Sequence, residues 1–141
     1  MDLTSRKVNI QASDSVVFGM LINCNNIAKY IPHDKIQDFQ SSETTCSFTV
    51  AGAGKIEMSL QNNTPHSQVS YLIGNSMMKA VSAVFQIESQ GNNSCDLYLS
   101  ATMDVPFFMA QMIKSSLQRF MDMLVDYIKI EAEKTKTNLY N

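Results

Sequence analysis

The sequence has no tryptophan, and only 17% of its 141 residues are charged. Its three cysteines, Cys24, Cys46 and Cys95, lie far apart in the chain and form no Cys-x-x-Cys pair. An odd number of widely spaced cysteines favours free thiols in a reducing compartment over a disulfide framework. We therefore expect a cytoplasmic protein without structural disulfides.

Long apolar runs and basic clusters are missing as well. No apolar run approaches the roughly 18 residues that a membrane-spanning helix needs. Residues 1–7 lead directly into a strand pattern, so we expect no signal peptide. The net charge is −2, the pI is near 5.6, and no cluster of lysine and arginine is present. These features argue against integral membrane association and against a nucleic-acid partner.

The chain also lacks the common catalytic and cofactor motifs: it has no GxSxG, P-loop, GxGxxG or HExxH sequence. His33 and His66 each follow a proline and have no second ligand at metal-binding spacing, so we predict no metal and no cofactor. No catalytic residue can be assigned. Five side chains are candidates for proton transfer: Tyr30, His33, Asp38, Tyr71 and Tyr98. Tyr71 is the best placed of them, because it lies on an apolar face where its hydroxyl needs a partner. A structural bond from that hydroxyl to the backbone or to water is the commoner outcome.

The strongest pattern is in residues 106–134, where apolar side chains recur at helical spacing. They are Met109, Ile113, Leu117, Phe120, Leu124, Tyr127 and Ile128, and Met112, Met121, Met123 and Ile130 widen this side to roughly half the circumference. The opposite side is polar, with Lys114, Gln118, Asp122, Asp126, Lys129 and Glu133. The pattern predicts one amphipathic helix of about eight turns that begins after Pro106 and buries Phe120. Residues 135–141 are expected to form a loose tail.

The pattern before this helix predicts a sheet. Residues 6–11 alternate as a first strand, Ser13 can cap a following helix, and a second short helix over residues 27–30 ends before Pro32. From residue 36 to residue 103, apolar and polar residues alternate between short turns, which is typical of an antiparallel meander with one apolar face. At this length we predict a single α+β domain over residues 1–134.

The order of these elements, and three short segments, carry a resemblance to a known superfamily. The segments are Ser13-Asp14-Ser15-Val16-Val17-Phe18, Asn26-Ile27-Ala28-Lys29-Tyr30-Ile31-Pro32 and Lys35-Ile36-Gln37-Asp38-Phe39. Together with the terminal helix they resemble the START-like, or birch-pollen-allergen-like, helix-grip superfamily (SRPBCC), and most of all its small bacterial polyketide cyclase/dehydrase and lipid transport proteins. The resemblance implies a curved antiparallel sheet wrapped around the long helix, with an apolar cavity between them. Members bind or carry lipids, sterols, polyketides or plant hormones, and some catalyse cyclisation or dehydration.

The predicted function is therefore the binding or transport of a small hydrophobic or amphipathic molecule in that cavity. Its walls would be Phe48, Met58, Tyr71, Phe85 and Leu99 from the sheet, and Met109, Ile113, Leu117 and Phe120 from the helix. Its mouth would lie near Tyr30, His33, Met77 and Phe108. Ordinary core packing is the alternative for each of these residues. Two other functions stay open: a polyketide cyclase- or dehydratase-like enzyme in the same cavity, and a ligand-free interaction module or homodimer that uses Met77 and Phe107.

Overall fold

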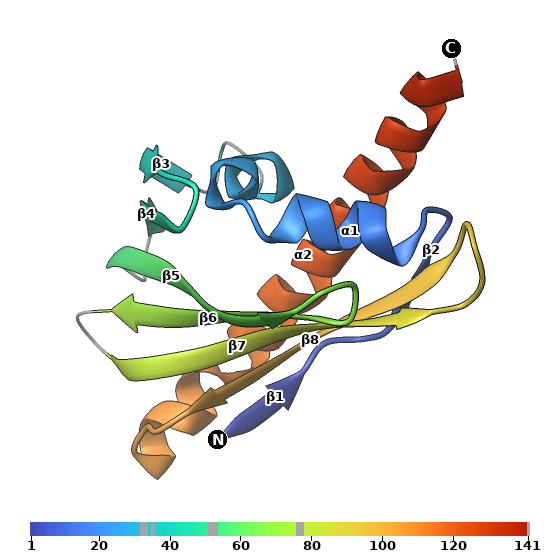
Figure 1. The fold of residues 1–141 in the computed structure, drawn as a ribbon. Coiled ribbons are helices and arrows are strands. Elements are labelled where there is room, and N and C mark those ends of the chain that lie inside the picture. The colour runs from blue at the N-terminus through green and yellow to red at the C-terminus, as the bar shows by residue number, and fades with distance from the viewer. Residues whose placement is uncertain (32–33, 35, 51–53, 76–77, 141) are drawn as a thin grey trace.

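The computed structural model describes residues 1–31, 34, 36–50, 54–75 and 78–140. Within these residues the chain forms eight strands, two α-helices and one 3₁₀ helix (Figure 1). In chain order they are β1 (Asp2–Thr4), β2 (Val8–Ile10), α1 (Asp14–Leu21), η1 (Cys24–Tyr30), β3 (Ile36–Ser41), β4 (Thr45–Val50), β5 (Gly54–Thr64), β6 (Gln68–Asn75), β7 (Met78–Ser89), β8 (Cys95–Met103) and α2 (Phe107–Tyr140).

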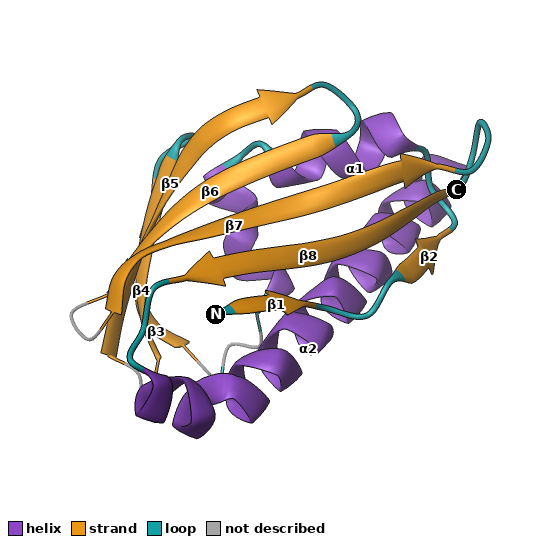
Figure 2. Ribbon diagram, turned by 90° about the horizontal axis from the view of Figure 1, so that it is seen from below, coloured by secondary structure: helices purple, strands orange, loops and turns teal. Residues whose placement is uncertain are grey.

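The strands form one antiparallel sheet in the order β1-β8-β7-β6-β5-β4-β3, and β2 also pairs with β8. In β8, buried and less buried residues alternate from Cys95 to Met103, as the two-residue periodicity predicted. Register shifts interrupt the β3–β4, β5–β6 and β6–β7 pairs, and such bulges bend a sheet. The sheet curves around α2 (Figure 2). The predicted helix-grip α+β fold is thereby confirmed.

The first strands differ from the sequence prediction. The strand expected over residues 6–11 is limited to β2, and β1 precedes it as an additional strand. Ser5, between the two, continues the pairing, because its backbone N–H donates to the Leu99 carbonyl and its hydroxyl accepts from the Leu99 N–H, both at 2.8 Å. A three-residue strand such as β1 has too few alternating positions to be recognised in a sequence.

Helix α1 begins at the predicted cap, where the Ser13 hydroxyl accepts from the Val16 N–H at 3.3 Å. Its C-terminal carbonyls are bonded by two tyrosines. The Tyr30 hydroxyl donates to the Met20 carbonyl at 3.1 Å, and the Tyr71 hydroxyl donates to the Leu21 carbonyl. These bonds satisfy carbonyls that the helix itself leaves open, and they fix α1 over the sheet.

Helix α2 begins directly after Pro106, as predicted, and continues to Tyr140. Residues 135–140, where we expected a loose tail, extend it. The segment after Pro106 contains neither glycine nor proline, so it has no signal that ends a helix. The last turns of α2 extend beyond the sheet (Figure 1).

Helix α2 is held along the β1–β2 edge of the sheet by a polar seam, a series of bonds between its polar side and the first residues of the chain. The seam joins Gln118 to the Thr4 carbonyl, Asp122 to the Arg6 N–H, Asp126 to the Arg6 guanidinium, Lys129 to the Asn9 carbonyl, and Glu133 to the Gln11 N–H. Three of these bonds have donor–acceptor distances of 2.8 to 2.9 Å. The seam fixes both the position and the rotation of the helix.

Candidate ligand-binding site

The inner face of the sheet, toward the helices, is built from residues that the strand register aligns in rows. One row crosses five strands in the order Leu60, Tyr71, Ala83, Ala101 and Leu3. The two alanines are the smallest side chains of this row, and they lie side by side on β7 and β8. The side chains of the inner face are therefore shortest in the middle of this row, next to Tyr71.

All five sheet residues that we predicted as cavity walls lie on this inner face and are buried. They are Phe48, Met58, Tyr71, Phe85 and Leu99. The Tyr71 and Phe85 rings meet edge to face, with centroids 6.2 Å apart. Burial is common to core packing and to a cavity wall, so ligand contact by these residues stays a prediction.

The four wall residues predicted on the helix, Met109, Ile113, Leu117 and Phe120, are half-buried. The expectation that Phe120 is buried was wrong: the buried residue is its neighbour Met121, with 2% of its surface exposed. Leu124 and Ile128 of the predicted apolar side are buried as expected, so the buried side is turned from the predicted one by less than the roughly 100° that one residue corresponds to. The sequence pattern could not set this rotation, because the polar seam and the contacts of α2 with β2 and η1 determine it.

Half-burial on the helix is matched on the sheet. Val50, Ile56 and Ile73 have apolar side chains on the inner face, and each is only half-buried. Their register supports this placement, since Ile56 pairs with Phe48 and Ile73 pairs with Met58. We call these three residues, together with Ile113, Leu117 and Phe120 of α2, the open end. The first turns of α2 and strand β4 lie toward the same end of the sheet (Figure 2).

Of the four residues predicted for the mouth, the structure describes two, Tyr30 and Phe108. Tyr30 is 1% exposed and belongs to the core, where burial raises the pKa of its hydroxyl. Phe108 is 66% exposed at the start of α2. His33 and Met77 lie outside the described residues. Tyr30 is therefore an anchor of α1, and the mouth stays a prediction.

A second cluster lies beneath α1 and η1, where Tyr71 meets two cysteines. The Cys24 thiol interacts with the Tyr71 hydroxyl and with the Cys46 thiol, and all three side chains are buried. Burial, followed by the neighbouring Cys24 thiol, raises the pKa of Cys46 to about 12. Burial likewise raises the pKa of Tyr71 above that of an ordinary tyrosine. The cluster is neutral at physiological pH, and the Tyr71 hydroxyl has the structural partner that its sequence context predicted.

The remaining candidates for proton transfer lie elsewhere. Asp38 is exposed on β3 with a left-handed backbone, at a φ of 57°, inside the β3–β4 register shift. Tyr98 alternates with the buried Leu97 and Leu99, so it lies on the outer face of the sheet, with the Lys7 ammonium 5.2 Å from its ring centre. Neither residue joins Tyr71, and the described residues offer no converging set of acid and base groups.

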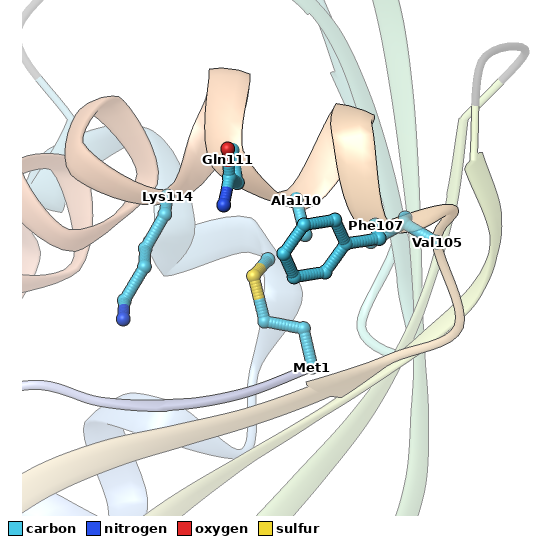
Figure 3. A pocket seen from close by; sticks show the side chains of 6 residues that line it. All are labelled: Met1, Val105, Phe107, Ala110, Gln111 and Lys114. Atoms are coloured by element: carbon cyan, nitrogen blue, oxygen red, sulfur yellow. The ribbon is translucent and has the colours of Figure 1, made fainter.

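Sequence reasoning missed a groove of about 700 Å³ at the start of α2. It is lined by Met1, Val105, Phe107, Ala110, Gln111 and Lys114 (Figure 3). Three of its residues, Phe107, Gln111 and Lys114, follow one side of the helix at intervals of four and three. Phe107 gave the only signal in the sequence, because it does not lie on the apolar face of the predicted helix. Met1 and Lys114 are 113 positions apart, so no local pattern connects them.

Three further observations bear on the kind of site. Among the described residues, no group of three or more histidine, cysteine, aspartate or glutamate side chains is arranged to hold a metal ion. In the same part of the chain, no helix combines the length and apolar character needed to cross a bilayer. All three cysteines are free and buried.

A curved antiparallel sheet around one long C-terminal helix, with two short helices after the first strands, is the helix-grip architecture of START-like and birch-pollen-allergen-like proteins. No protein-family model matches the sequence, and no curated protein matches it. Solved structures do match the fold. Norcoclaurine synthase from Thalictrum flavum, as a point mutant with a transition-state analogue, aligns with a TM-score of 0.77 at 9% identity over 96% of both chains.

Two further structures extend the comparison. A START superfamily protein from Mycobacterium smegmatis aligns with a TM-score of 0.70 at 11% identity, over 95% of this chain and 98% of its own. A conserved protein from Geobacillus kaustophilus aligns with a TM-score of 0.73 at 11% identity, over 96% and 97%. The resemblance predicted from the sequence is thereby confirmed as one of fold. At such low identity it transfers no ligand and no reaction.

Proposed function

We propose that the protein binds a small hydrophobic or amphipathic molecule, such as a lipid, between the inner face of the sheet and the first half of α2. The observation that carries this proposal is the open end. Apolar side chains on two facing elements are only half-buried there, whereas Val125 and Ile128, farther along α2, are fully buried. An apolar surface that the protein itself leaves partly uncovered is favourable for an apolar ligand.

The fold supports the proposal without fixing the ligand. A second structure of norcoclaurine synthase, with a TM-score of 0.74 at 9% identity, is a complex with dopamine and hydroxybenzaldehyde. Those ligands belong to that protein. They support the present proposal only in size, as examples of small ring compounds that this architecture accommodates.

The test fills the site from inside. Ala83→Leu and Leu117→Phe enlarge one sheet residue and one helix residue, and Ser82→Leu places the same added volume on the outer face of β7. A neutral fluorescent probe, N-phenyl-1-naphthylamine, is titrated against each protein, and thermal unfolding is recorded. We expect both inner variants to bind the probe at least about tenfold more weakly with little loss of stability, and Ser82→Leu to bind it unchanged.

A closely packed interior predicts the reverse. Added methylenes then strain the core and cost about 1–3 kcal/mol of unfolding free energy. Absence of probe binding by the wild type, together with this loss in both inner variants, would exclude the proposed site.

The enzymatic alternative has less support. A cyclase- or dehydratase-like reaction needs an acid or base with a suitable pKa inside the site. The Tyr71 hydroxyl donates to the Leu21 carbonyl, and burial raises its pKa, so it is a poor proton-transfer group at neutral pH. Binding without chemistry is therefore the proposal.

The interaction-module alternative depends on the exposed start of α2. Phe107 and Phe108 are 79% and 66% exposed, and an apolar surface of this kind is common where partners meet. A homodimer through this surface remains the second proposal, and the oligomeric state in solution tests it. A cytoplasmic location likewise remains a proposal, supported by three free thiols that a reducing compartment would preserve.

A further inference from the structure

The groove at the start of α2 has an uneven distribution of charge. Its six lining residues include one cationic side chain, Lys114, and one amide, Gln111, but no carboxylate; the Met1 ammonium donates to the Met103 carbonyl at 2.6 Å. In Figure 3 the Lys114 and Gln111 side chains extend from the helix on the groove side. Across the described ranges of the chain, no carboxylate forms an ion pair with Lys114. No carboxylate of the groove lining therefore balances the charge of Lys114.

The polar seam shows what is missing at Lys114 and Gln111. These two residues continue the helix side that carries Gln118 and Asp122, at intervals of three and four. Gln118 and Asp122 have partners on the first residues of the chain, at 2.9 and 2.8 Å. Gln111 and Lys114 face the groove instead. On this side of the helix, Gln111 and Lys114 are therefore the two residues that another molecule can bind.

The other part of the groove is apolar. The Phe107 ring lies beside the Met1 thioether, and Val105 and Ala110 complete this part (Figure 3). Phe107 is 79% exposed although it lines a groove. Covering a large apolar side chain of this kind contributes about 25 cal/mol for each Å² removed from water. A ligand that reaches Phe107 therefore gains affinity from a surface that the protein leaves uncovered.

The two parts lie at a defined separation. Seven residues separate Phe107 from Lys114, which is about 10 Å along a helix at 1.5 Å per residue. We infer that the groove binds an amphipathic carboxylate, with the acid group at Lys114 and Gln111 and the apolar chain or ring between Phe107 and Met1. This site is distinct from the one proposed above, because Phe107, Gln111 and Lys114 occupy a different side of α2 from Ile113, Leu117 and Phe120.

A single small molecule fits the groove better than a membrane surface. Attachment to anionic lipid bilayers depends on several basic residues in one patch. The groove has one, and two exposed carboxylates, Asp2 and Asp104, are near it in the sequence. A volume of about 700 Å³ also lies within the range of small-molecule sites.

The test compares decanoate with decanol, which has the same chain length but no charge. Binding is followed by amide chemical shifts of the full-length protein. We expect decanoate to shift the amides of residues 105–114. Lys114→Gln should weaken decanoate binding by up to about fivefold, as expected for an exposed ion pair, and leave decanol binding unchanged. Phe107→Ala should weaken the binding of both decanoate and decanol.

Each variant has a matched control. Arg119→Gln removes the same charge from an exposed position of α2 that does not line the groove, and Phe108→Ala removes the neighbouring exposed phenylalanine. Both controls should bind decanoate as the wild type does. Equal weakening by Lys114→Gln and Arg119→Gln would overturn the inference, since the effect would then come from net charge alone.

Three other results would also overturn it. One is the absence of decanoate binding by the wild type. Another is binding to phosphatidylglycerol vesicles without binding of monomeric decanoate, which indicates a membrane surface. The third is a dimer that Phe107→Ala dissociates, which indicates a second copy on this surface. Uptake of the neutral probe by the inner site is measured separately on Lys114→Gln. If the wild type binds decanoate but takes up no neutral probe, the result contradicts the inner site and leaves the groove site intact.

Discussion

The two halves of α2 differ in how the rest of the chain covers them. In the second half, Met121, Val125, Ile128 and Ala132 are at most 2% exposed, and the polar seam bonds the adjacent side to the first residues. We call this half, with α1 and η1, the packed end. In the first half, the apolar residues toward the sheet are half-buried, and Phe107, Phe108 and Met112 are 66% to 79% exposed.

The difference teaches that one continuous helix can serve two purposes. The packed end supplies the buried apolar area that stabilises the domain. The open end leaves apolar surface available, and this surface contributes to affinity only when a ligand covers it. Substitutions in the two halves should therefore have different effects, even where the residue types are the same.

The largest contrast is expected between two isoleucines of α2. Ile128→Ala removes a fully buried side chain and should cost about 2–5 kcal/mol of unfolding free energy. Ile113→Ala removes a half-buried side chain and should cost about 1 kcal/mol, because folding removes less of the area of that side chain from water. Urea unfolding of both variants measures the difference. Equal losses would mean that the first half of the helix is packed as closely as the second.

A pH titration examines whether water reaches the buried thiols of the core. Burial raises the pKa of Cys46 to about 12 and that of Cys95 to about 11, from ordinary values of 9.0. Above pH 9 the unfolded chain loses these protons while the folded chain keeps them, so stability should fall as pH rises through 9 to 11. The slope is at most about 1.4 kcal/mol per pH unit for each thiol.

Cys46→Ala provides the control for this titration, because it removes one of the three buried thiols, and burial also raises the pKa of the third, Cys24. The slope between pH 9 and 11 should become shallower in this variant, whatever its stability at pH 7. An unchanged slope would show that Cys46 is accessible to water.

The smallest contrast concerns the polar seam. From the sequence, Asp122 belongs to a free polar face, where substitutions change stability by less than about 0.5 kcal/mol. In the structure its carboxylate accepts from the Arg6 N–H at 2.8 Å and from Gln118 at 3.3 Å. Asp122→Ala should therefore cost about 1–2 kcal/mol, as for a hydrogen bond to a charged group. Lys114→Ala, on the same side but without such a partner, should stay within about 0.5 kcal/mol in thermal unfolding.

Much of the fold could be predicted from the sequence because its signals are local. Two-residue alternation from Ile36 to Met103 indicated the strands, the Ser13 hydroxyl marked the start of α1, and Pro106 marked the start of α2. Each of these signals depends on residues that are neighbours in the chain. They therefore remain readable without any knowledge of the tertiary structure.

The site could be predicted only in part, because its features depend on distant pairs. The five inner-face residues of the sheet were found by alternation. The rotation of α2, and hence the half-burial of Phe120, depends on Arg6, which is 116 positions from its partner Asp122. The groove depends on Met1 approaching Lys114. No periodicity within a segment contains such information.

The polar seam also has a consequence for the order in which the chain can fold. Its bonds join residues 114 to 122 positions apart, and within the described part of the chain the partner of both β1 and β2 is β8. Contacts of such long sequence separation form late, because a large loop must close before they contribute. The meander from β3 to β8 consists of neighbours and can form first. During synthesis on a ribosome, residues 2–11 therefore emerge well before their partners: β1 and β2 wait for β8, and the bonds of the polar seam wait for α2.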